Sequence, residues 1–279
     1  MEEDNQQRYY ASKNYPLPAD EAEIERLNVQ HPVIVRSFEN RLSLAPLDLK
    51  SGDRVLESIW ALEFFEENKR TGINLDIECF DISNRVFPKK HPPNVHFSVH
   101  SVTDLPAEWN STFSYIHQRL LIAVMTDDIC RRTISELFRA LAPGGWAELV
   151  EIEGKDVHFG IGPASNKVQS ILLKMYAEKG MVGNLDKYLP PVLEEVGFVD
   201  VRCEVRHTLI GQPDEGGYSA EEWGKFWRGL RRDVLERGGY GLVQSGEEYE
   251  KLVDETVLEW ETGSNKAYIT YYTFLGRKP

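Results

Sequence analysis

Two residues whose side chains could do acid–base or charge chemistry, His117 and Arg119, stand at the end of the apolar run Tyr115–Gln118. Such a run is typical of a strand, and the carboxyl ends of parallel strands meet the ligand crevice of an α/β fold. A histidine there could act as a general base or orient a carbonyl near neutral pH. We therefore take His117 and Arg119 as candidate catalytic residues. The alternative for His117 is a hydrogen-bonded histidine between the sheet and a helix.

Three further carboxyl groups, Glu148, Glu151 and Glu153, lie in or just after the next apolar run. Strand alternation puts Glu151 and Glu153 on one face, but solvated carboxylates at a strand end are the commoner case, and we expect that here. The sequence contains no recognisable cluster of metal ligands, no Ser-His-Asp order and no phosphate-binding loop, so we expect no metal.

The composition limits the possible partners, because the 279 residues carry a formal net charge of −13 at pH 7. A protein that wraps nucleic acid or lies on an anionic membrane needs a basic face, so we expect neither partner. A small molecule, neutral or cationic, or a protein partner fits this charge better. No apolar run is long enough for a transmembrane helix or typical of a leader, and the three cysteines suggest neither disulfides nor zinc. We expect a cytoplasmic protein, with the nucleus as the alternative.

Beyond Gly52 the chain alternates short apolar strands with amphipathic helices, which predicts a mostly parallel sheet with helices on both faces. The expected strands are Arg54–Glu57, Asp76–Asp81, Val95–Val99, Tyr115–Gln118, Trp146–Glu151, Asp200–Ile210 and Tyr268–Gly276. We expect the last two, with the long excursion between them, to close an edge of the sheet in antiparallel orientation. The expected helices are Ile59–Lys69, Ile129–Leu141, Lys167–Lys179, a segment from Pro190 to Gly197, Ala220–Arg237 and Glu247–Glu261. The glycines of Pro143-Gly144-Gly145 predict a turn before the fifth strand.

The pattern divides the chain into two parts. Residues 1–50 are an N-terminal arm and a helical lid, whose helix opens at Asp20 and runs to the stop at Pro46. Residues 51–279 are the α/β domain, with a helical insertion at about 211–263. In the arm, Tyr10 and Tyr15 could close over an aromatic substrate or could simply hold the arm in place.

Several short phrases occur in a fixed order along almost the whole chain. They are Tyr15-Pro16-Leu17-Pro18-Ala19-Asp20, Arg26-Leu27, Gln30-His31, Arg54-Val55-Leu56-Glu57, Ile59-Trp60-Ala61-Leu62-Glu63-Phe64, Cys79-Phe80-Asp81-Ile82-Ser83, Pro92-Pro93-Asn94-Val95, Tyr115-Ile116-His117-Gln118-Arg119, Leu141-Ala142-Pro143-Gly144-Gly145-Trp146 and Gly276-Arg277-Lys278-Pro279. Together they resemble the fungal LaeA-like class I S-adenosylmethionine methyltransferases of secondary metabolism. The resemblance implies a Rossmann-like fold with a seven-stranded, mostly parallel sheet.

The resemblance also implies a Gly-x-Gly-x-Gly-type turn after the first strand, because only glycine lets the backbone approach the cofactor closely. Here Glu57-Ser58 runs directly into Ile59-Trp60, about five residues short of the family pattern, although βα loops normally have about two to six residues. The glycine loop is missing, so we expect a filled or misshapen pocket and a cofactor that binds weakly or not at all.

Other cofactor positions implied by the resemblance are partly altered. Glu57 ends the first strand, and Asp81 is the expected ribose-binding carboxylate, although it could equally form an Asx turn. Ser101 stands where the family has an acid for the adenine amino group, and Ser114 replaces another acid. A deletion alone could be an error in the gene model, but the changes at Ser101 and Ser114 indicate relaxed selection for the cofactor.

We expect side chains of the chain itself, chiefly Ile59 and Trp60, to occupy the space left by the missing loop. Burying a side chain of this size stabilises a fold by about 1.5 to 3 kcal/mol. The indole N–H of Trp60 would then need a partner, such as Glu57, Asp81 or a backbone carbonyl. Trp60 is thus a candidate pocket residue beside Tyr10 and Tyr15. The alternative is that Trp60 is an ordinary core residue on its helix.

Three functions follow from these expectations. The first is a methyltransferase-fold protein that acts on a small-molecule biosynthetic intermediate without methyl transfer, as a cyclase or by suppressing shunt products. The second is a true methyltransferase with unusual cofactor binding. The third is a non-enzymatic regulator that acts through a protein partner. The fold alone does not choose between them, because function depends on the site.

Overall fold

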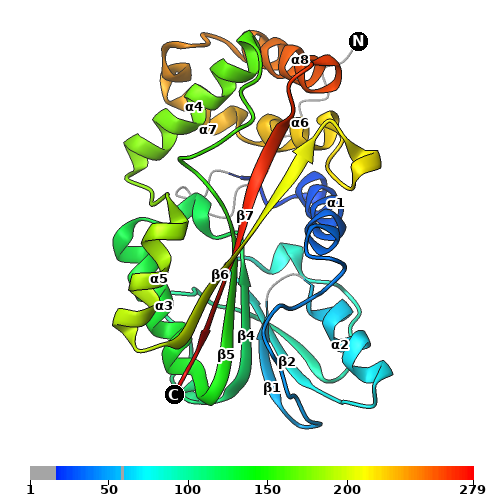
Figure 1. The fold of residues 1–279 in the computed structure, drawn as a ribbon, viewed down its shortest axis with the longest axis vertical. Coiled ribbons are helices and arrows are strands. Elements are labelled where there is room, and N and C mark those ends of the chain that lie inside the picture. Colours follow the sequence, from blue (N-terminus) through cyan, green and yellow to red (C-terminus); the bar gives the residue numbers. More distant parts are fainter. Residues whose placement is uncertain (1–16, 58–59) are drawn as a thin grey trace.

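A seven-stranded sheet forms the centre of the protein, in a computed structural model that describes residues 17–57 and 60–279. The strand order is β3-β2-β1-β4-β5-β7-β6, and all neighbouring pairs are parallel except the two made by β7 (Figure 1). The strands are β1 (Arg54–Glu57), β2 (Asp76–Asp81), β3 (Val95–Val99), β4 (Phe113–Arg119), β5 (Leu141–Ile152), β6 (Val199–Ile210) and β7 (Ala267–Arg277). The predicted α/β fold is therefore confirmed.

The last two strands close one edge of the sheet as an antiparallel pair, as predicted. Within this pair β7 lies inside, between β5 and β6, and β6 forms the edge. The burial pattern gives the reason: β7 is buried along almost its full length, whereas β6 has many exposed positions and suits the edge. The predicted turn at Pro143-Gly144-Gly145 is an irregularity within β5, where Gly144 has a φ of +81°.

Helices cover both faces of the sheet. In Figure 1, α2 (Ala61–Arg70) lies on one side, and α3 (Asp127–Ala140) and α5 (Leu185–Val196) lie together on the other. The predicted start of α5 at Pro190 was wrong by five residues. The carboxylate of Glu153 accepts the backbone N–H groups of Asn184 and Leu185, at 3.0 Å each, so the helix begins there and the prolines lie inside it.

A helical cap stands beyond the carboxyl ends of the parallel strands. It consists of α4 (Pro163–Lys179), α6 (Ala220–Gly229), α7 (Arg231–Glu236) and α8 (Gly246–Thr262), with α8 packed against α4 and α6 (Figure 1). We predicted one helix over 220–237, but it divides at Leu230 into α6 and α7. Gly229, a weak helix former, ends α6 where Leu17 packs against it.

The lid helix α1 (Glu21–Ser37) packs against α6 and β6. Its start agrees with the prediction, because the Asp20 side chain accepts the N–H of Glu23 at 3.1 Å. It ends well before Pro46, however, since Glu39 and Asn40 adopt left-handed backbone angles with φ of 56° and 59°. The segment after α1 therefore runs over the sheet as an irregular strap.

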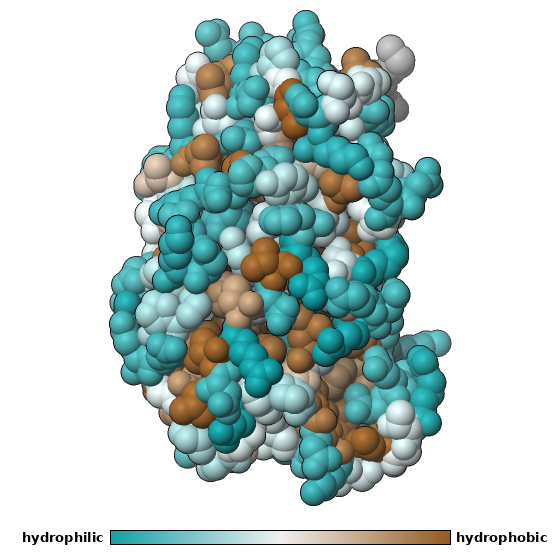
Figure 2. Space-filling model, in the orientation of Figure 1, coloured by the Kyte–Doolittle hydropathy of each residue, from teal (hydrophilic) through white to brown (hydrophobic). Residues whose placement is uncertain are grey.

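Five short 3₁₀ helices complete the described elements: Asn84–Val86, Ala107–Trp109, Ile122–Val124, Pro213–Glu215 and Gly238–Gly241. Figure 2 shows apolar side chains on one face of the molecule in small groups separated by hydrophilic ones. Within residues 17–57 and 60–279, none of the helices combines the length and the apolar character needed to cross a bilayer.

Candidate functional site

The carboxyl ends of β1 and β4 bring three of the predicted site residues together. Val55 and Leu56 pair with Tyr115 and Ile116, so Glu57 and His117 follow side by side on adjacent parallel strands. The Oε1 atom of Glu57 lies 2.7 Å from Nδ1 of His117. Trp60, at the start of α2, is the third residue of this group and contacts His117.

Trp60 is only 2% exposed, and its indole N–H donates to Nδ1 of His117 at 3.1 Å. The two rings meet edge to face with centroids 4.5 Å apart. The predicted burial of Trp60 is thus confirmed, but its hydrogen-bond partner is His117, not Glu57 or Asp81. The reason is that β4 lies next to β1 in the sheet and brings His117 to this point.

This geometry limits the acid–base role of His117. Burial lowers the pKa of His117 well below its usual value, and the positive Arg119 adds to the effect, so the imidazole is neutral. Because the indole N–H of Trp60 donates to Nδ1, the ring proton of His117 lies on Nε2. His117 therefore resembles the packed, hydrogen-bonded alternative, and its catalytic assignment stays a prediction.

Arg119 lies next to this group, 9% exposed, with its guanidinium 5.6 Å from the ring of Trp60. Its Nη1 atom donates to Nδ1 of His31 on the lid helix at 3.0 Å. The Nε2 atom of His31 in turn lies 2.6 Å from a carboxylate oxygen of Glu63 on α2. A polar chain therefore joins α1, α2 and β4. Apart from the phrase Gln30-His31, no signal in the sequence marks His31 as a site residue.

Asp81 ends β2, and Ser101 lies just after β3. The Oδ1 atom of Asp81 accepts the N–H of Ser83 at 2.8 Å, which is the Asx turn that we kept as its alternative. Burial raises the pKa of Asp81. Its neighbour Ile82 is 57% exposed. Ser101 is exposed, and its hydroxyl contacts that of Thr103 at 2.8 Å. The other predicted pocket residues, Tyr10, Tyr15 and Ile59, lie outside the described residues.

Glu148 and Glu151 of β5 and Glu153 just after it contradict our expectation of solvated strand-end carboxylates, because all three are buried. Each accepts backbone N–H groups from a segment distant in the sequence: 44–45 for Glu148, 121–122 for Glu151 and 184–185 for Glu153. Glu153 also accepts the N–H groups of the nearby residues 155–156. The three carboxylates thus hold these loops against the end of β5.

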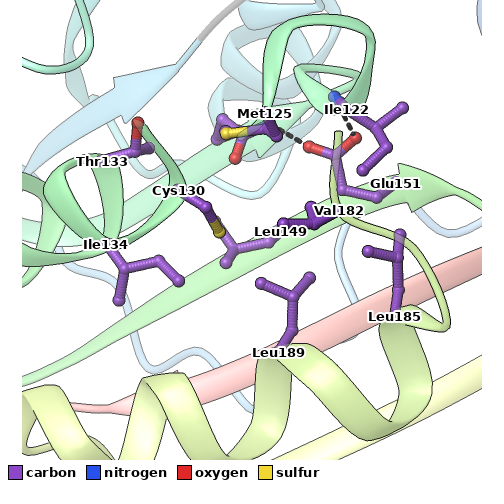
Figure 3. A pocket seen from close by; sticks show the side chains of 11 residues that line it. Ile122, Met125, Cys130, Thr133, Ile134, Leu149, Glu151, Val182, Leu185 and Leu189 are labelled. Atoms are coloured by element: carbon purple, nitrogen blue, oxygen red, sulfur yellow. Dashed lines mark hydrogen bonds between the residues drawn. The ribbon is translucent and has the colours of Figure 1, made fainter. Parts of the chain in front are cut away.

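Glu151 lines a small cavity of about 10 Å³, room for at most one water molecule, between β4, β5, α3 and α5 (Figure 3). Its oxygens accept from Gln118 Nε2 at 2.6 Å and from the N–H groups of Leu121 and Ile122 at 3.0 Å each. Burial raises the pKa of Glu151 to about 7, against the effect of these hydrogen bonds. The cavity is too small for a substrate.

Replacement of Glu151 by Gln is expected to flatten the pH dependence of stability. A folded pKa of about 7, above the usual value of 4.5, favours folding while the group is protonated. This contribution is complete below about pH 4.5 and is lost as pH rises through about 7, a change of up to about 3 kcal/mol. Urea unfolding at several pH values between about 5 and 8 measures it.

The control for this comparison is Glu255→Gln, which removes an exposed carboxyl group on α8. Its unfolding free energy should follow the wild-type curve at every pH. A difference between wild type and Glu151→Gln that stays constant with pH would contradict the prediction.

A second, larger cavity of about 390 Å³ is open to solvent between the strap at 40–49 and α2. Leucine side chains of the strap and Phe64 form its apolar part, and Arg41, Asp48 and Glu67 are among its polar residues. It does not include Trp60, His117 or Arg119. In the part of the chain that the structure describes, no three His, Cys, Asp or Glu side chains are grouped to hold a metal ion.

The strand order, the single antiparallel strand and the helices on both faces define a class I S-adenosylmethionine-dependent methyltransferase fold. The N-methyltransferase sirN of Leptosphaeria maculans is 33% identical over 207 residues, 69% of this chain and 70% of the relative. The N-methyltransferase gliN of Aspergillus fumigatus is 27% identical over 96% of this chain and 98% of its own. The chain belongs to the LaeA-like class I methyltransferase family of fungal secondary metabolism.

The secondary metabolism regulator LAE1 of Hypocrea atroviridis is also similar, at 28% identity over 50% of this chain and 40% of its own length. Among solved structures, a phosphoethanolamine N-methyltransferase of Haemonchus contortus, in complex with S-adenosylhomocysteine, superposes with a TM-score of 0.50. It is 17% identical and covers 90% of this chain and 52% of its own, so it shows the fold alone. No protein-family model matches the chain.

The described residues fit S-adenosylmethionine at one end only. A half-buried carboxylate at Asp81 beside the exposed Ile82 suits a ribose and an adjoining base, which need a hydrogen-bond acceptor and an apolar surface. At the ends of β1 and β4, Trp60 and His117 are packed against each other and buried. The described residues thus include groups that suit the nucleoside of the cofactor, whereas this pair offers no open space for a ligand.

Proposed function

We propose that this protein acts on a small-molecule intermediate of fungal secondary metabolism without transferring a methyl group. The observation that carries the proposal is the hydrogen-bonded pair of Trp60 and His117 at the ends of β1 and β4. A cofactor that reached this point would have to displace a side chain that is almost completely buried. The remaining crevice would serve by orienting and desolvating a reactive intermediate, as in a cyclase or a factor that suppresses shunt products.

Calorimetric titration with S-adenosylmethionine and S-adenosylhomocysteine tests this proposal. We expect no saturable heat up to about 1 mM ligand, because displacing Trp60 and breaking its bond to His117 costs more than the nucleoside contacts supply. Circular dichroism would verify that the protein used is folded. Binding in the micromolar range, together with transfer of a labelled methyl group to an amine, would overturn the proposal.

N-methyl transfer is the second candidate function, and the pair Asp81 and Ile82 favours it. These residues keep a carboxylate and an apolar surface where a nucleoside could lie. The relatives sirN and gliN are both N-methyltransferases. Under this alternative Trp60 would have to move away from Glu57 and His117 when the cofactor binds, so binding should quench or shift the fluorescence of Trp60. Comparison with a Trp60→Phe variant would show how much of the fluorescence change comes from Trp60.

A further inference from the structure

Arg119 is a buried cation without a neutralising contact. It is 9% exposed, and among residues 17–57 and 60–279 none of the ion pairs includes its guanidinium. Burial lowers the pKa of Arg119, and the negative charge of Glu57 only partly opposes this. An unpaired charge in a protein interior destabilises the fold by several kcal/mol. A buried arginine without an anionic partner in the chain suggests that a bound ligand supplies the anion.

The guanidinium presents a free edge in a fixed orientation. Nη1 is occupied by His31, whereas Nε has no hydrogen-bond partner and Nη2 has none among the described residues. Nε and Nη2 form the two-donor edge that matches the two oxygens of a carboxylate. The ring of Trp60, 5.6 Å from the guanidinium carbon, packs against the same group.

His31 orients the arginine without neutralising it. Its Nδ1 accepts the hydrogen bond from Arg119, so the imidazole must be neutral at that nitrogen, and its Nε2–H donates to Glu63 at 2.6 Å. Burial, and after it the charge of Arg119, lowers the pKa of His31, which keeps this neutral form. The lid helix α1 thus holds the guanidinium of Arg119 in place through His31.

The groups around Arg119 are polar but mostly uncharged. Tyr218 and Tyr271 lie close enough to interact with its charge, and their hydroxyls share a hydrogen bond of 2.7 Å. The other charged groups that act on Arg119 are Glu57 and Glu148, and Glu148 is itself surrounded by four donors. A ligand with a single negative charge would therefore meet the cation of Arg119 and the hydroxyls of Tyr218 and Tyr271, against the charges of Glu57 and Glu148.

We propose that the Nε/Nη2 edge of Arg119 binds the carboxylate of the intermediate on which this protein acts. The inference rests on the proposed function and adds the substrate class, a small organic acid. The net charge of −13 led us to expect a neutral or cationic ligand. That expectation applies to the protein surface, whereas the local charge beside Trp60 comes from Arg119. The carboxylate would form two parallel charge-assisted hydrogen bonds with the guanidinium.

Benzoate and its uncharged analogue benzamide are suitable probes, because they have nearly the same size and an aromatic ring that could pack near Trp60. We expect calorimetry to show benzoate binding at least tenfold more tightly than benzamide. Arg119→Met should abolish this preference, and Arg119→Lys should weaken it, since lysine keeps the charge but not the two-donor edge. Arg131→Met, which removes an exposed arginine paired with Asp127 and Glu195, is the control and should bind like wild type.

The denaturation midpoint distinguishes a ligand-binding arginine from one that only stabilises the fold. Arg119→Met should raise the denaturation midpoint, because an apolar side chain of similar length replaces an unpaired buried cation. A lower midpoint for Arg119→Met, or equal binding of benzoate and benzamide to wild type, would overturn the inference. If Arg119→Met does not fold, the Arg119→Lys variant decides by its benzoate preference.

Titration with S-adenosylhomocysteine, which also carries a carboxylate, separates the two possible sources of the anion. Binding that disappears in Arg119→Lys would assign the arginine to the cofactor and would overturn both this inference and the proposed function. Binding that is unchanged in Arg119→Lys would overturn the proposed function alone. If S-adenosylhomocysteine does not bind, while benzoate binds in a way that depends on Arg119, the result supports both this inference and the proposed function.

Discussion

Insertion of Gly-Thr-Gly-Thr-Gly between Ser58 and Ile59 is expected to increase the affinity for S-adenosylmethionine at least tenfold, or about 1.4 kcal/mol. The insertion lengthens the connection between β1 and α2 by five residues. It lets the start of α2 move away from the strand ends and take Trp60 with it. The glycines allow the backbone to approach the cofactor where a side chain would prevent contact. Calorimetry on the two proteins measures the difference.

A second insertion of equal length without glycine, Ala-Thr-Ala-Thr-Ala, separates the two effects of the loop. If length alone matters, both insertions should bind equally well, whereas a need for close backbone approach favours the glycine version. Adding Ser101→Asp to the glycine version should raise the affinity further, because a charged acceptor makes a stronger hydrogen bond than a neutral one. Unchanged affinity in both glycine variants would show that the short connection between β1 and α2 does not limit cofactor binding.

The fold was predictable because its strands are local signals in the sequence. The first three strands have the predicted bounds, Arg54–Glu57, Asp76–Asp81 and Val95–Val99, since each is a short apolar run between turn residues. Helix ends were less predictable, because they depend on contacts. The start of α5 is set by Glu153, which is far from Leu185 in the sequence. The end of α1 is set by left-handed residues that no apolar pattern reveals.

The position of the candidate site was predictable from the sequence, but the contacts and the burial of its ionisable side chains were not. Sequence spacing placed His117 and Arg119 at the end of β4, where the structure has them. It could not show that His117 contacts Trp60 and Glu57, because those residues come from a different βα unit. It also could not show that Glu148, Glu151 and Glu153 are buried, since a carboxylate is stable inside a protein only when distant donors reach it.

The crevice is therefore divided into two regions of different chemistry. Toward β2 it retains Asp81 and the exposed Ile82, which suit a nucleoside. Toward β4 it holds Trp60, His117 and Arg119, which suit packing and an anion. The lid helix reaches only the second region, through His31. The two regions can therefore be tested separately by the variants above, because those at Arg119 leave Asp81 unchanged.

Replacement of Glu148 by Ala is expected to lower the free energy of unfolding by about 3 to 5 kcal/mol. The buried carboxylate accepts hydrogen bonds from the hydroxyls of Ser43 and Tyr115, at 2.7 and 2.9 Å, and from the backbone N–H groups of Leu44 and Ala45, at 3.0 and 3.1 Å. Burial raises the pKa of Glu148, although all four bonds oppose the effect. Without the side chain, these donors remain in the interior with no acceptor, and that desolvation cost is the largest single loss we expect from one residue. Urea unfolding measures it.

The loss should also be local, because Glu148 attaches the strap after the lid helix to the centre of the sheet. Hydrogen exchange of the Leu44 and Ala45 amides should become much faster in Glu148→Ala, while amides of α8 change little. Tyr115→Phe removes only one of the four donors and should cost about 1 kcal/mol. Glu66→Ala, at an exposed position on α2, should stay within about 0.5 kcal/mol of wild type. If Glu148→Ala costs no more than Tyr115→Phe, the strap is held by its leucines instead, and the carboxylate is not the anchor that its four hydrogen bonds indicate.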